Sequence, residues 1–315
     1  MLIYIFRRIL LSCGVLLLLL ALVFVVFRLI PGDPALLVLG KNPSAESLTA
    51  LRSKFGHDRP LPIQFVKWLD QALRGDLGSS RIGNQSVASL IMQKFPLTLE
   101  LAALAMVFGC GIGVPMGVLS AIKRDTPLDV LARGVSLLGF SVPNYWLAIL
   151  MIILFSLYLG WLPVAGYVSP SDDLEQHLLY LVLPALTLGL PIAAEQMRFL
   201  RASMLEVINQ DYIRTAWAKG LEPRTIVMKH ALKNAIIPFL TIVGLQFGYL
   251  LAGSVIIEQI FSWPGIGWLT YQSIIFRDYA VVQGTVLVSA AGFLIINLLV
   301  DFGYVWLDHR LRIDE

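Results

Sequence analysis

The sequence predicts an all-α membrane protein with six transmembrane helices. Hydrophobic residues make up 57% of its 315 positions and charged residues only 14%, whereas a soluble domain carries about a quarter charged residues. Six apolar runs are each long enough to cross a hydrocarbon core about 30 Å thick. Lys and Arg also cluster in alternate loops between these runs, as expected when successive loops lie on opposite sides of a bilayer.

The first apolar run, residues 9–30, follows Arg7 and Arg8 and could therefore be a secretory signal peptide. The run is long enough to span a bilayer, however, and no small-x-small cleavage site follows it between Arg28 and Pro34. We therefore predict a retained N-terminal transmembrane helix over residues 1–30.

Residues 31–95 form a polar insert between the first two spans, and we expect it to lie outside the cytoplasm. Within the insert, residues 60–74 carry apolar side chains on one helical stripe and polar ones elsewhere. The stripe consists of Phe65, Val66, Leu69 and Leu73. This pattern predicts a short amphipathic helix.

The remaining runs predict a five-helix core over residues 96–308, followed by a short cytoplasmic tail at 309–315. They cover residues 98–122, 134–160, 177–200, 236–257 and 281–307. Pro143, Pro184 and Pro191 interrupt two of them, which a membrane bundle tolerates where neighbouring helices or cavity water satisfy the freed carbonyl groups.

The distribution of Lys and Arg predicts that both termini and the loop at 201–235 are cytoplasmic. The loop at 161–176 carries neither residue and the loop at 258–280 carries only Arg277, so we place these loops outside. The charges on the other side are Arg7, Arg8, Lys123, Arg124, Arg133, Arg198, Arg201, Arg214, Lys219, Arg224, Lys229, Lys233, Arg310 and Arg312. Trp161 and Trp263 are then expected at the outer membrane interface, where aromatic rings favour the headgroup layer.

Several classes of function are excluded by what the chain lacks. The formal net charge of +3 is too small to indicate nucleic acid as a partner. No G-x-x-x-x-G-K-[ST] loop, nucleophile elbow or H-E-x-x-H motif occurs, so we expect no enzyme activity, and no bound cofactor, in this chain. Cys13 and Cys110 lie in apolar runs and are interpreted as buried hydrophobes, and the four His residues are too scattered for a metal site.

Ionisable side chains at membrane depth are costly and point to function unless they are paired. Glu195 lies three residues before Arg198, which favours an ion pair on one helix face. Asp301 is expected to meet a cation of the 201–235 loop, and Glu100 to reach the outer interface. We therefore favour structural roles for these three carboxylates.

Four polar residues are better candidates for lining a translocation pathway. Gln246 and Asn297 lie nearer the middle of the membrane, where they could also form hydrogen bonds between helices. Ser141 and Asn144 flank Pro143, so they could present polar groups to a lumen from a broken helix.

The loop at 203–237 predicts two helices joined by a glycine turn. The first runs to Lys219 and stops at Gly220, a residue that readily ends a helix in the left-handed conformation. Pro223 suits the first turn of the second helix, over residues 224–234. We expect the small residues Ala216, Ala218 and Gly220 to be exposed, which would let another protein approach closely. The alternative is a structured loop that is basic only because it is cytoplasmic.

The chain resembles the membrane subunit of the dipeptide/oligopeptide/nickel family of bacterial ABC importers over essentially its whole length. Most specific is the segment Asp211–Leu221 followed by Lys229–Pro238, which is similar to that family's coupling loop. The other matching segments, in order and with matching spacing, are Pro31–Ala35, Asp76–Ser80, Phe95–Leu99, Gly139–Trp146, Gly160–Pro163, Arg201–Glu206 and Phe261–Gly267. Ser86 departs from the proline usual before Val87, and Arg214–Ala216 stand where the general importer loop begins Glu-Ala-Ala.

The resemblance implies the type I ABC importer permease fold in the bacterial inner membrane. It also implies a second, homologous permease subunit, two ATPase subunits that bind ATP and Mg²⁺, and an extracytoplasmic substrate-binding protein. The residues it assigns to ATPase coupling are Asp211, Tyr212, Arg214, Thr215, Ala216, Ala218, Lys219, Gly220 and Leu221.

The sequence leaves more than one possibility for the cargo and for the energy source. Di- or oligopeptides are the family's commonest cargo, and nickel or another metal chelate and glutathione are the other cargoes. From another class, an ion-coupled secondary transporter or channel would use an ion-binding residue among Glu195, Gln246 and Asp301. A membrane-embedded enzyme is disfavoured because no paired catalytic residues occur.

Overall fold

The computed structural model describes residues 2–29, 44 and 60–307. Contacts divide the chain into two compact units: Leu2–Phe95 with Leu269–Ala291, and Pro96–Trp268 with Gly292–Glu315. The expectations for residues 31–59, for the tail at 309–315 and for the side chain of Asp301 fall outside what the structure describes. Within the described part the regular elements are helices, accompanied by an isolated antiparallel bridge between Ser79 and Ser86.

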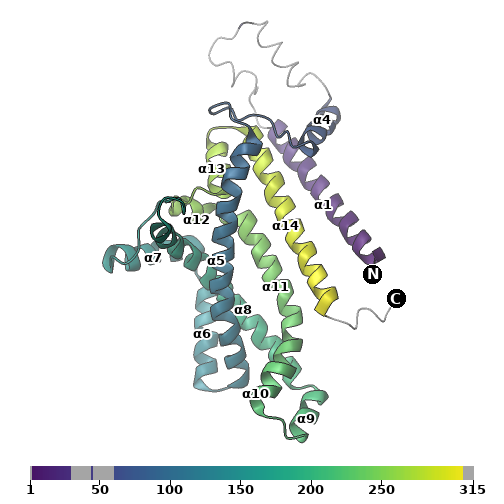
Figure 1. Cartoon of the computed structure of the whole chain (residues 1–315), viewed down its shortest axis with the longest axis vertical. Coiled ribbons are helices and arrows are strands. Elements are labelled where there is room, and N and C mark those ends of the chain that lie inside the picture. Colours follow the sequence, from purple (N-terminus) through teal and green to yellow (C-terminus); the bar gives the residue numbers. More distant parts are fainter. Residues whose placement is uncertain (1, 30–43, 45–59, 308–315) are drawn as a thin grey trace. The chain divides into compact units, whose positions relative to one another are not determined.

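In the larger unit, long helices carry a set of short ones at their ends and bends (Figure 1). Helices α5 and α14 contribute residues to both units. The elements are α5 (Val87–Ile122), α6 (Pro127–Ser141), α7 (Asn144–Met151), a π-helix (Ile152–Tyr158), α8 (Leu174–Ile208), α9 (Asp211–Ala218), α10 (Pro223–Thr225), a second π-helix (Ile226–Ala231), α11 (Leu232–Gly253), α12 (Val255–Ile260), α13 (Ile266–Ile275) and α14 (Tyr279–Leu307).

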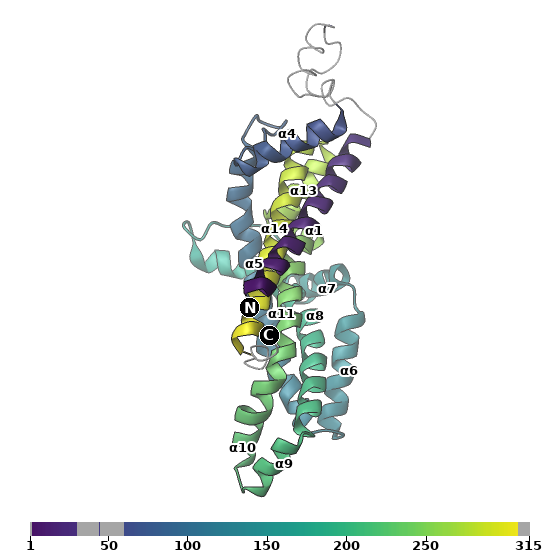
Figure 2. The same cartoon turned by 90° about the vertical axis from the view of Figure 1, so that its right-hand side faces the viewer.

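The smaller unit contains α1 (Leu2–Leu29) and the amphipathic α4 (Leu61–Leu73), close to its predicted bounds (Figure 2). The ring of Phe24 on α1 packs against Phe65 and Trp68 of α4, with centroids 5.5 and 6.0 Å apart. Cys13 is exposed on α1, so the expectation that it is a buried hydrophobe is wrong.

A buried carboxylate fastens the turn before α5 to the start of α14 in the same unit. Asp278 Oδ2 accepts hydrogen bonds from the Ser80 hydroxyl at 2.6 Å and from the Arg81 backbone N–H at 2.8 Å. The Val281 N–H donates to Oδ1 at 3.5 Å, so both oxygens are used locally, and the residue is only 3% exposed. Asp278 has a structural role that its sequence position, next to Arg277, did not reveal.

In the described residues, five helices are long and apolar enough to cross a membrane, and a bent pair would make a sixth. That pair corrects the predicted run at 134–160, because it is not one straight helix: α6 and the helix that begins at Asn144 meet at 104°. Pro143 has no N–H to continue the helix and forces Val142 into extended backbone with φ −82° and ψ 125°. Pro184 and Pro191, by contrast, stay inside the continuous α8.

Helices α5 and α8 approach so closely that only glycine fits between them. A Cβ atom on Gly113 would lie 2.8 Å from the carbonyl oxygen of Ala193 and 2.9 Å from Cβ of Gln196. Gly109 and Gly117, one turn away on either side, face α8 in the same way. Small residues at this four-residue spacing allow backbones to pack by van der Waals contact, which drives helix association where lipid removes the hydrophobic effect.

The predicted interfacial position of Trp263 is wrong, because the segment after α12 folds back into the core. Trp263 is fully buried, and its Nε1–H donates to the carbonyl oxygen of Leu97 at 3.0 Å. Its ring meets Tyr167 edge to face, with centroids 5.2 Å apart. Trp161 is 66% exposed, as a membrane-facing ring would be in the isolated chain.

We expect Gly113→Leu to destabilise the fold strongly, because the new side chain would overlap the α8 backbone. Gly111→Leu is the matched control: it lies on the same helix, a Cβ atom added there would meet nothing within 4 Å, and it gains the same helix propensity of about 1 kcal/mol. Thermal unfolding in detergent should show a large drop in Tm for the first variant alone. Equal Tm values for the two variants would contradict the packing described above.

Candidate functional site

The most distinctive surface feature of the larger unit is a short hairpin at one end of α8 and α11 (Figures 1 and 2). This hairpin, residues 211–231, consists of α9, the turn at 219–222, α10 and the second π-helix. It interrupts the passage from α8 to α11. A two-residue turn at 209–210 separates it from α8, whereas its second arm runs directly into α11. The predicted separate second helix at 224–234 is in fact the beginning of the helix that continues to Gly253.

A glycine ends α9 with a defined hydrogen-bond pattern. Gly220 has φ +72°, its N–H donates to the carbonyl of Trp217 at 2.9 Å, and the Leu221 N–H donates to the carbonyl of Ala216 at 3.3 Å. These two bonds make a Schellman motif, in which glycine at the left-handed position avoids the steric cost of a Cβ atom. The turn is therefore rigid, and the space around Gly220 is open.

One face of α9 anchors the hairpin to the helix bundle. Ile213 is 1% exposed and Ala216 is 7% exposed, and both belong to a core cluster with Leu200 and Met204 of α8. The expectation that Ala216 is exposed is therefore wrong, since its methyl group is part of this anchor. Ala218 and Gly220 are exposed as expected.

Hydrogen bonds hold α9 to the start of α11 as well. Asn234 Nδ2 donates to the Tyr212 hydroxyl at 3.0 Å and to the carbonyl oxygen of His230 at 2.8 Å. The Tyr212 hydroxyl in turn donates to the same His230 carbonyl, at 3.4 Å. Tyr212 thus spans the two arms of the hairpin while part of its ring remains exposed.

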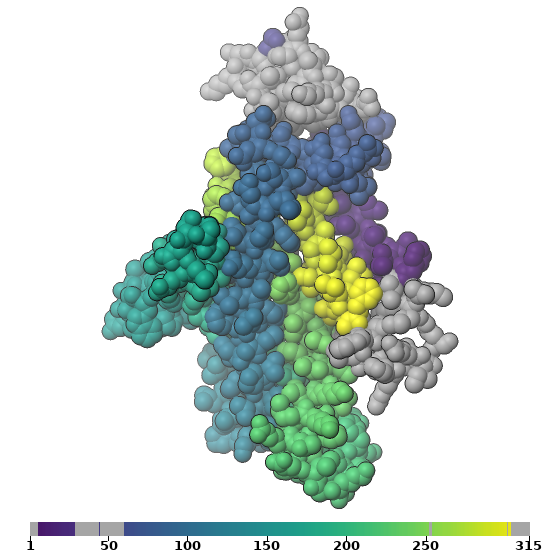
Figure 3. Space-filling model, in the orientation of Figure 1, coloured from purple at the N-terminus to yellow at the C-terminus, as the bar shows by residue number. Residues whose placement is uncertain are grey.

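The hairpin lies at the surface of the molecule (Figure 3, green), and its outer face combines exposed apolar and charged side chains. The large apolar side chains exposed there are Tyr212, Trp217, Leu221 and Met228, between 37% and 53% accessible. Among the charged ones, Arg214 lies 3.4 Å from Asp211, and both are exposed. Thr215 donates to the carbonyl oxygen of Asp211 within α9. Such a mixture of exposed rings and cations is typical of a protein-binding surface.

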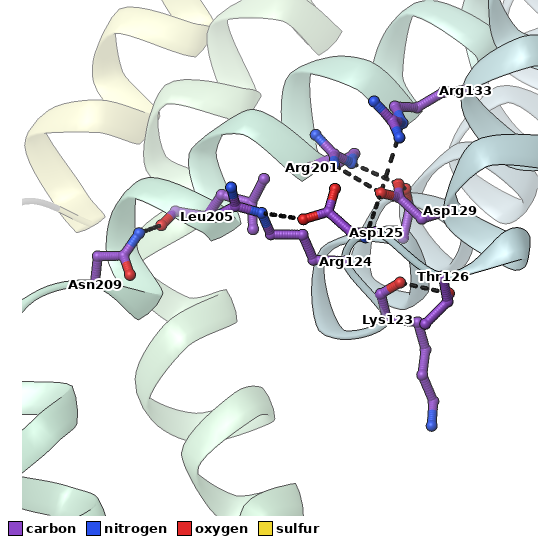
Figure 4. Close-up of polar contacts among 10 residues, drawn as sticks. Lys123, Arg124, Asp125, Thr126, Asp129, Arg133, Arg201, Leu205 and Asn209 are labelled. Atoms are coloured by element: carbon purple, nitrogen blue, oxygen red, sulfur yellow. Dashed lines mark hydrogen bonds and ion pairs between the residues drawn. The ribbon is translucent and has the colours of Figure 1, made fainter.

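The base of the hairpin is fixed by a buried charge cluster (Figure 4). Asp129 of α6 is fully buried and receives two hydrogen bonds from Arg201 of α8, Nε to Oδ1 and Nη2 to Oδ2, both at 2.8 Å. The Ser120 hydroxyl of α5 and the Asp125 backbone N–H also donate to it. Arg133 adds an ion pair at 3.5 Å. A bidentate pair of this kind sets distance and orientation together.

This cluster ties three helices together within about three turns of the hairpin. Arg201 lies on α8, ten residues before Asp211, and α8 ends where Asn209 Nδ2 donates to the carbonyl of Leu205 at 2.8 Å. Asp125, by contrast, points outward to Arg124 and forms an exposed pair at 3.1 Å. The sequence contains no spacing signal for the pairing of Asp129 with Arg201, because the two residues lie 72 positions apart.

The predicted ion pair between Glu195 and Arg198 is wrong. The Arg198 guanidinium lies over the ring of Phe140, 4.6 Å from its centroid, whereas Glu195 Oε2 accepts a hydrogen bond from Gln246 Nε2 at 2.8 Å. Gln246 Oε1 in turn accepts from Gln196 Nε2 at 2.8 Å. Gln246 therefore forms hydrogen bonds between α8 and α11, one of the two roles expected for it.

The other pathway candidates have separate surroundings. The Ser141 hydroxyl donates to the Leu137 carbonyl of its own helix at 2.8 Å, just before the bend. Asn144 is the half-buried first residue of α7, and Asn297 is half-buried on α14. The structure gathers none of these three around Gln246, and their assignment to a pathway stays a prediction.

Glu100 was expected to extend to the outer membrane interface. In the structure it pairs with His177. His177 Nε2 lies 2.8 Å from Glu100 Oε1, and Nδ1 lies 2.7 Å from the carbonyl oxygen of Val168. Both partner atoms are oxygens that can only accept hydrogen bonds, so both ring nitrogens of His177 face acceptors, as in a protonated imidazole. The pair joins α5 to α8 at the end opposite the hairpin.

Glu258 is another buried carboxylate that sequence reasoning missed. It accepts hydrogen bonds from the Thr98 hydroxyl at 2.8 Å, the Ser254 hydroxyl at 2.7 Å and the Trp268 N–H at 2.8 Å. Burial raises the pKa of this carboxyl, and these donors oppose the rise. A Cβ atom on Gly265 would lie 2.6 Å from both carboxylate oxygens, which explains a glycine of the Phe261–Gly267 motif.

Comparisons with known proteins show the family to which the chain belongs. Residues 113–313 match the family described as binding-protein-dependent transport system inner membrane component, and residues 1–102 match its N-terminal region. A protein named as a peptide transport system permease from Brucella abortus is 43% identical over 98% of this chain and 99% of its own. A glutathione transport system permease from Escherichia coli is 40% identical over 99% of both chains.

Solved structures support the fold. A methionine ABC transporter solved in inward-facing conformations has a chain that superposes with a TM-score of 0.59 at 21% identity, covering 70% of this chain and 97% of that one. An amino acid ABC transporter gives a TM-score of 0.52 at 16% identity over 69% and 93% of the two chains. The chain therefore belongs to the binding-protein-dependent transport system inner membrane components, as an ABC importer permease of the dipeptide/oligopeptide/nickel family.

Proposed function

We propose that this chain forms half of the translocation pathway of an ATP-driven importer and that the 211–231 hairpin docks on a separate ATPase. A second, homologous permease would supply the other half, two ATPases would bind ATP and Mg²⁺, and an extracytoplasmic protein would deliver the cargo. The hairpin and both termini then lie in the cytoplasm, in keeping with the many cations near residues 198–233.

The observation that carries this proposal is the combination of an exposed outer face and a fixed inner face on one short hairpin. Trp217 and Leu221 are available to a partner, while Ile213 and Ala216 are locked into the bundle. A loop that was cationic only to satisfy membrane orientation would need neither a buried anchor nor a defined glycine turn. A docking element needs both.

The contacts that hold the hairpin to the helix bundle would let it act as a lever, meaning a rigid element that transmits movement to the helices. A displacement applied to the hairpin would pass to α8 through the packed side chains of Ile213 and Ala216, and to α11 through the continuous second arm. From α8 it would pass through Arg201 to Asp129 on α6. The glycine contacts join α5 to α8. Closure of two ATPases would therefore move these helices together rather than bend the loop, which is how a packed element transmits a two-state change.

The cargo we propose is a di- or oligopeptide. The curated relatives include proteins named as peptide permeases and as glutathione permeases, and glutathione is itself a short peptide. Nickel or another metal chelate is the remaining alternative within the family. Uptake of radiolabelled dipeptides, glutathione and nickel by the reconstituted importer separates the three.

Gly220→His should weaken ATPase docking, because His fills the open space yet accepts the left-handed backbone better than most residues. Gly75→His is a matched control: Gly75 has φ +83°, ends α4 with the same hydrogen-bond pattern and also has nothing within 4 Å. Co-purification of the ATPase subunits and ATP-driven peptide uptake should fall for Gly220→His alone.

Full uptake and full ATPase recovery with Gly220→His would contradict docking at the hairpin. Uptake by the lone chain in vesicles without ATP, following a proton or sodium gradient, would instead establish the ion-coupled transporter as the correct class.

Asp129→Asn should uncouple ATP hydrolysis from transport. Removing the charge leaves the Arg201 guanidinium without its counter-ion in a buried site, a change that costs on the order of 3 kcal/mol. The Tm of the complex should fall. The ratio of peptide transported to ATP hydrolysed should also fall, and by more than in a variant of the exposed Arg124–Asp125 pair. Asp125→Asn is the control, and an unchanged ratio in Asp129→Asn would refute the lever.

A further inference from the structure

Glu195 is a half-buried acidic side chain of α8 that forms no ion pair with a cation of the described residues. The depth follows from its neighbours, since Gln246 on α11 and Met106 on α5 both lie about two helical turns or more inside the apolar runs at 236–257 and 98–122. Gln196 Nε2 approaches Met106 Sδ at 3.3 Å, which places residues 195 and 196 at that depth. A carboxylate there is costly unless something offsets it.

The amide groups around Glu195 fix it as an acceptor. Gln196 Nε2 donates to Gln246 Oε1, so the Gln246 amide must turn its Nε2 toward Glu195, where it donates to Oε2. Both amides are at least nine-tenths buried, and Gln196 Oε1 has no hydrogen-bond partner among the described residues. This relay orients the carboxylate without neutralising it, because an amide supplies a dipole and no positive charge.

The nearest candidate cation is turned away from this carboxylate. Arg198 lies one helical turn further along α8, but its guanidinium is stacked over Phe140 of α6. Glu195 itself is only half-buried, and the rings one turn from the relay on each helix are exposed, Phe199 by 45% and Tyr249 by 61%. A face that carries a carboxylate beside aromatic rings suits a cation in a water-filled passage and does not suit lipid.

We propose that Glu195, oriented by Gln246, is a cation-binding point of the translocation pathway that receives the protonated amino group of the transported peptide. The proposal rests on the importer function proposed above and names a specificity site within it. A primary ammonium donates up to three hydrogen bonds, so it can use the free carboxylate oxygen that the relay leaves open. The exposed rings of Phe199 and Tyr249 offer cation–π contact on the way.

The test compares uptake of a dipeptide with uptake of its N-acetylated form by the complete importer in proteoliposomes. Glu195→Gln should reduce uptake of the free dipeptide by about tenfold, the loss expected for one charge-assisted hydrogen bond, and should leave the acetylated form unchanged. Because every assay uses the same binding protein, its own preference cancels in the ratio of variant to wild type. Gln246→Met should produce a smaller loss in the same direction.

Glu206→Gln is the control, since Glu206 lies on the same exposed stripe of α8, three turns nearer the hairpin. It should change neither rate. An equal loss for both peptides in Glu195→Gln, or a complex that falls apart on size-exclusion chromatography, would show that the missing cation comes from the second permease subunit and would overturn the proposal. Retained ATPase stimulation in Glu195→Gln separates this failure from failure of the importer function itself.

Discussion

The close approach of α5 and α8 is the constraint on which the packing of the larger unit depends. Gly109, Gly113 and Gly117 bring the two backbones together, and the Gln196 amide of α8 reaches Met106 of α5 across this contact. Ser120 of α5 and Arg201 of α8 also bind the same carboxylate of α6. The absence of side chains along one stripe of α5 therefore sets the separation at which groups of the two helices meet.

The most firmly held contacts of the larger unit lie near the hairpin, where a docked ATPase would apply force. The hairpin is anchored by two buried apolar side chains and ends α9 with a glycine turn, whereas α6 and α8 are joined nearby by a bidentate ion pair. The Pro143 bend lies at the far end of α6 from this pair. A displacement at the hairpin thus meets stiff packing first and a proline bend only afterwards, an order that favours transmission over local deformation.

Periodicity and charge were sufficient to predict the helical class, most spans, the amphipathic α4 and the glycine turn, because these follow from local composition. They could not predict partners distant in sequence. Asp129 lies 72 positions from Arg201, and Glu258 lies 160 positions from Thr98, so neither pair has a sequence signal. The glycines at 109, 113 and 117 were a readable signal of close packing. The prediction for Trp263 was wrong because an aromatic residue in a loop between two spans suggests a membrane interface. The sequence does not show whether such a loop stays on the surface or folds inward.

The glycine-lined pocket of Glu258 has a consequence for biogenesis. Its donors come from Thr98, near the beginning of the larger unit, and from Ser254 and Trp268, which are synthesised about 160 residues later. The first turn of α13 takes its hydrogen-bond acceptor from this carboxylate, so it cannot be completed until the early and late parts of the chain have met in the bilayer. The ribosome must therefore synthesise the chain as far as Trp268 before this corner can form.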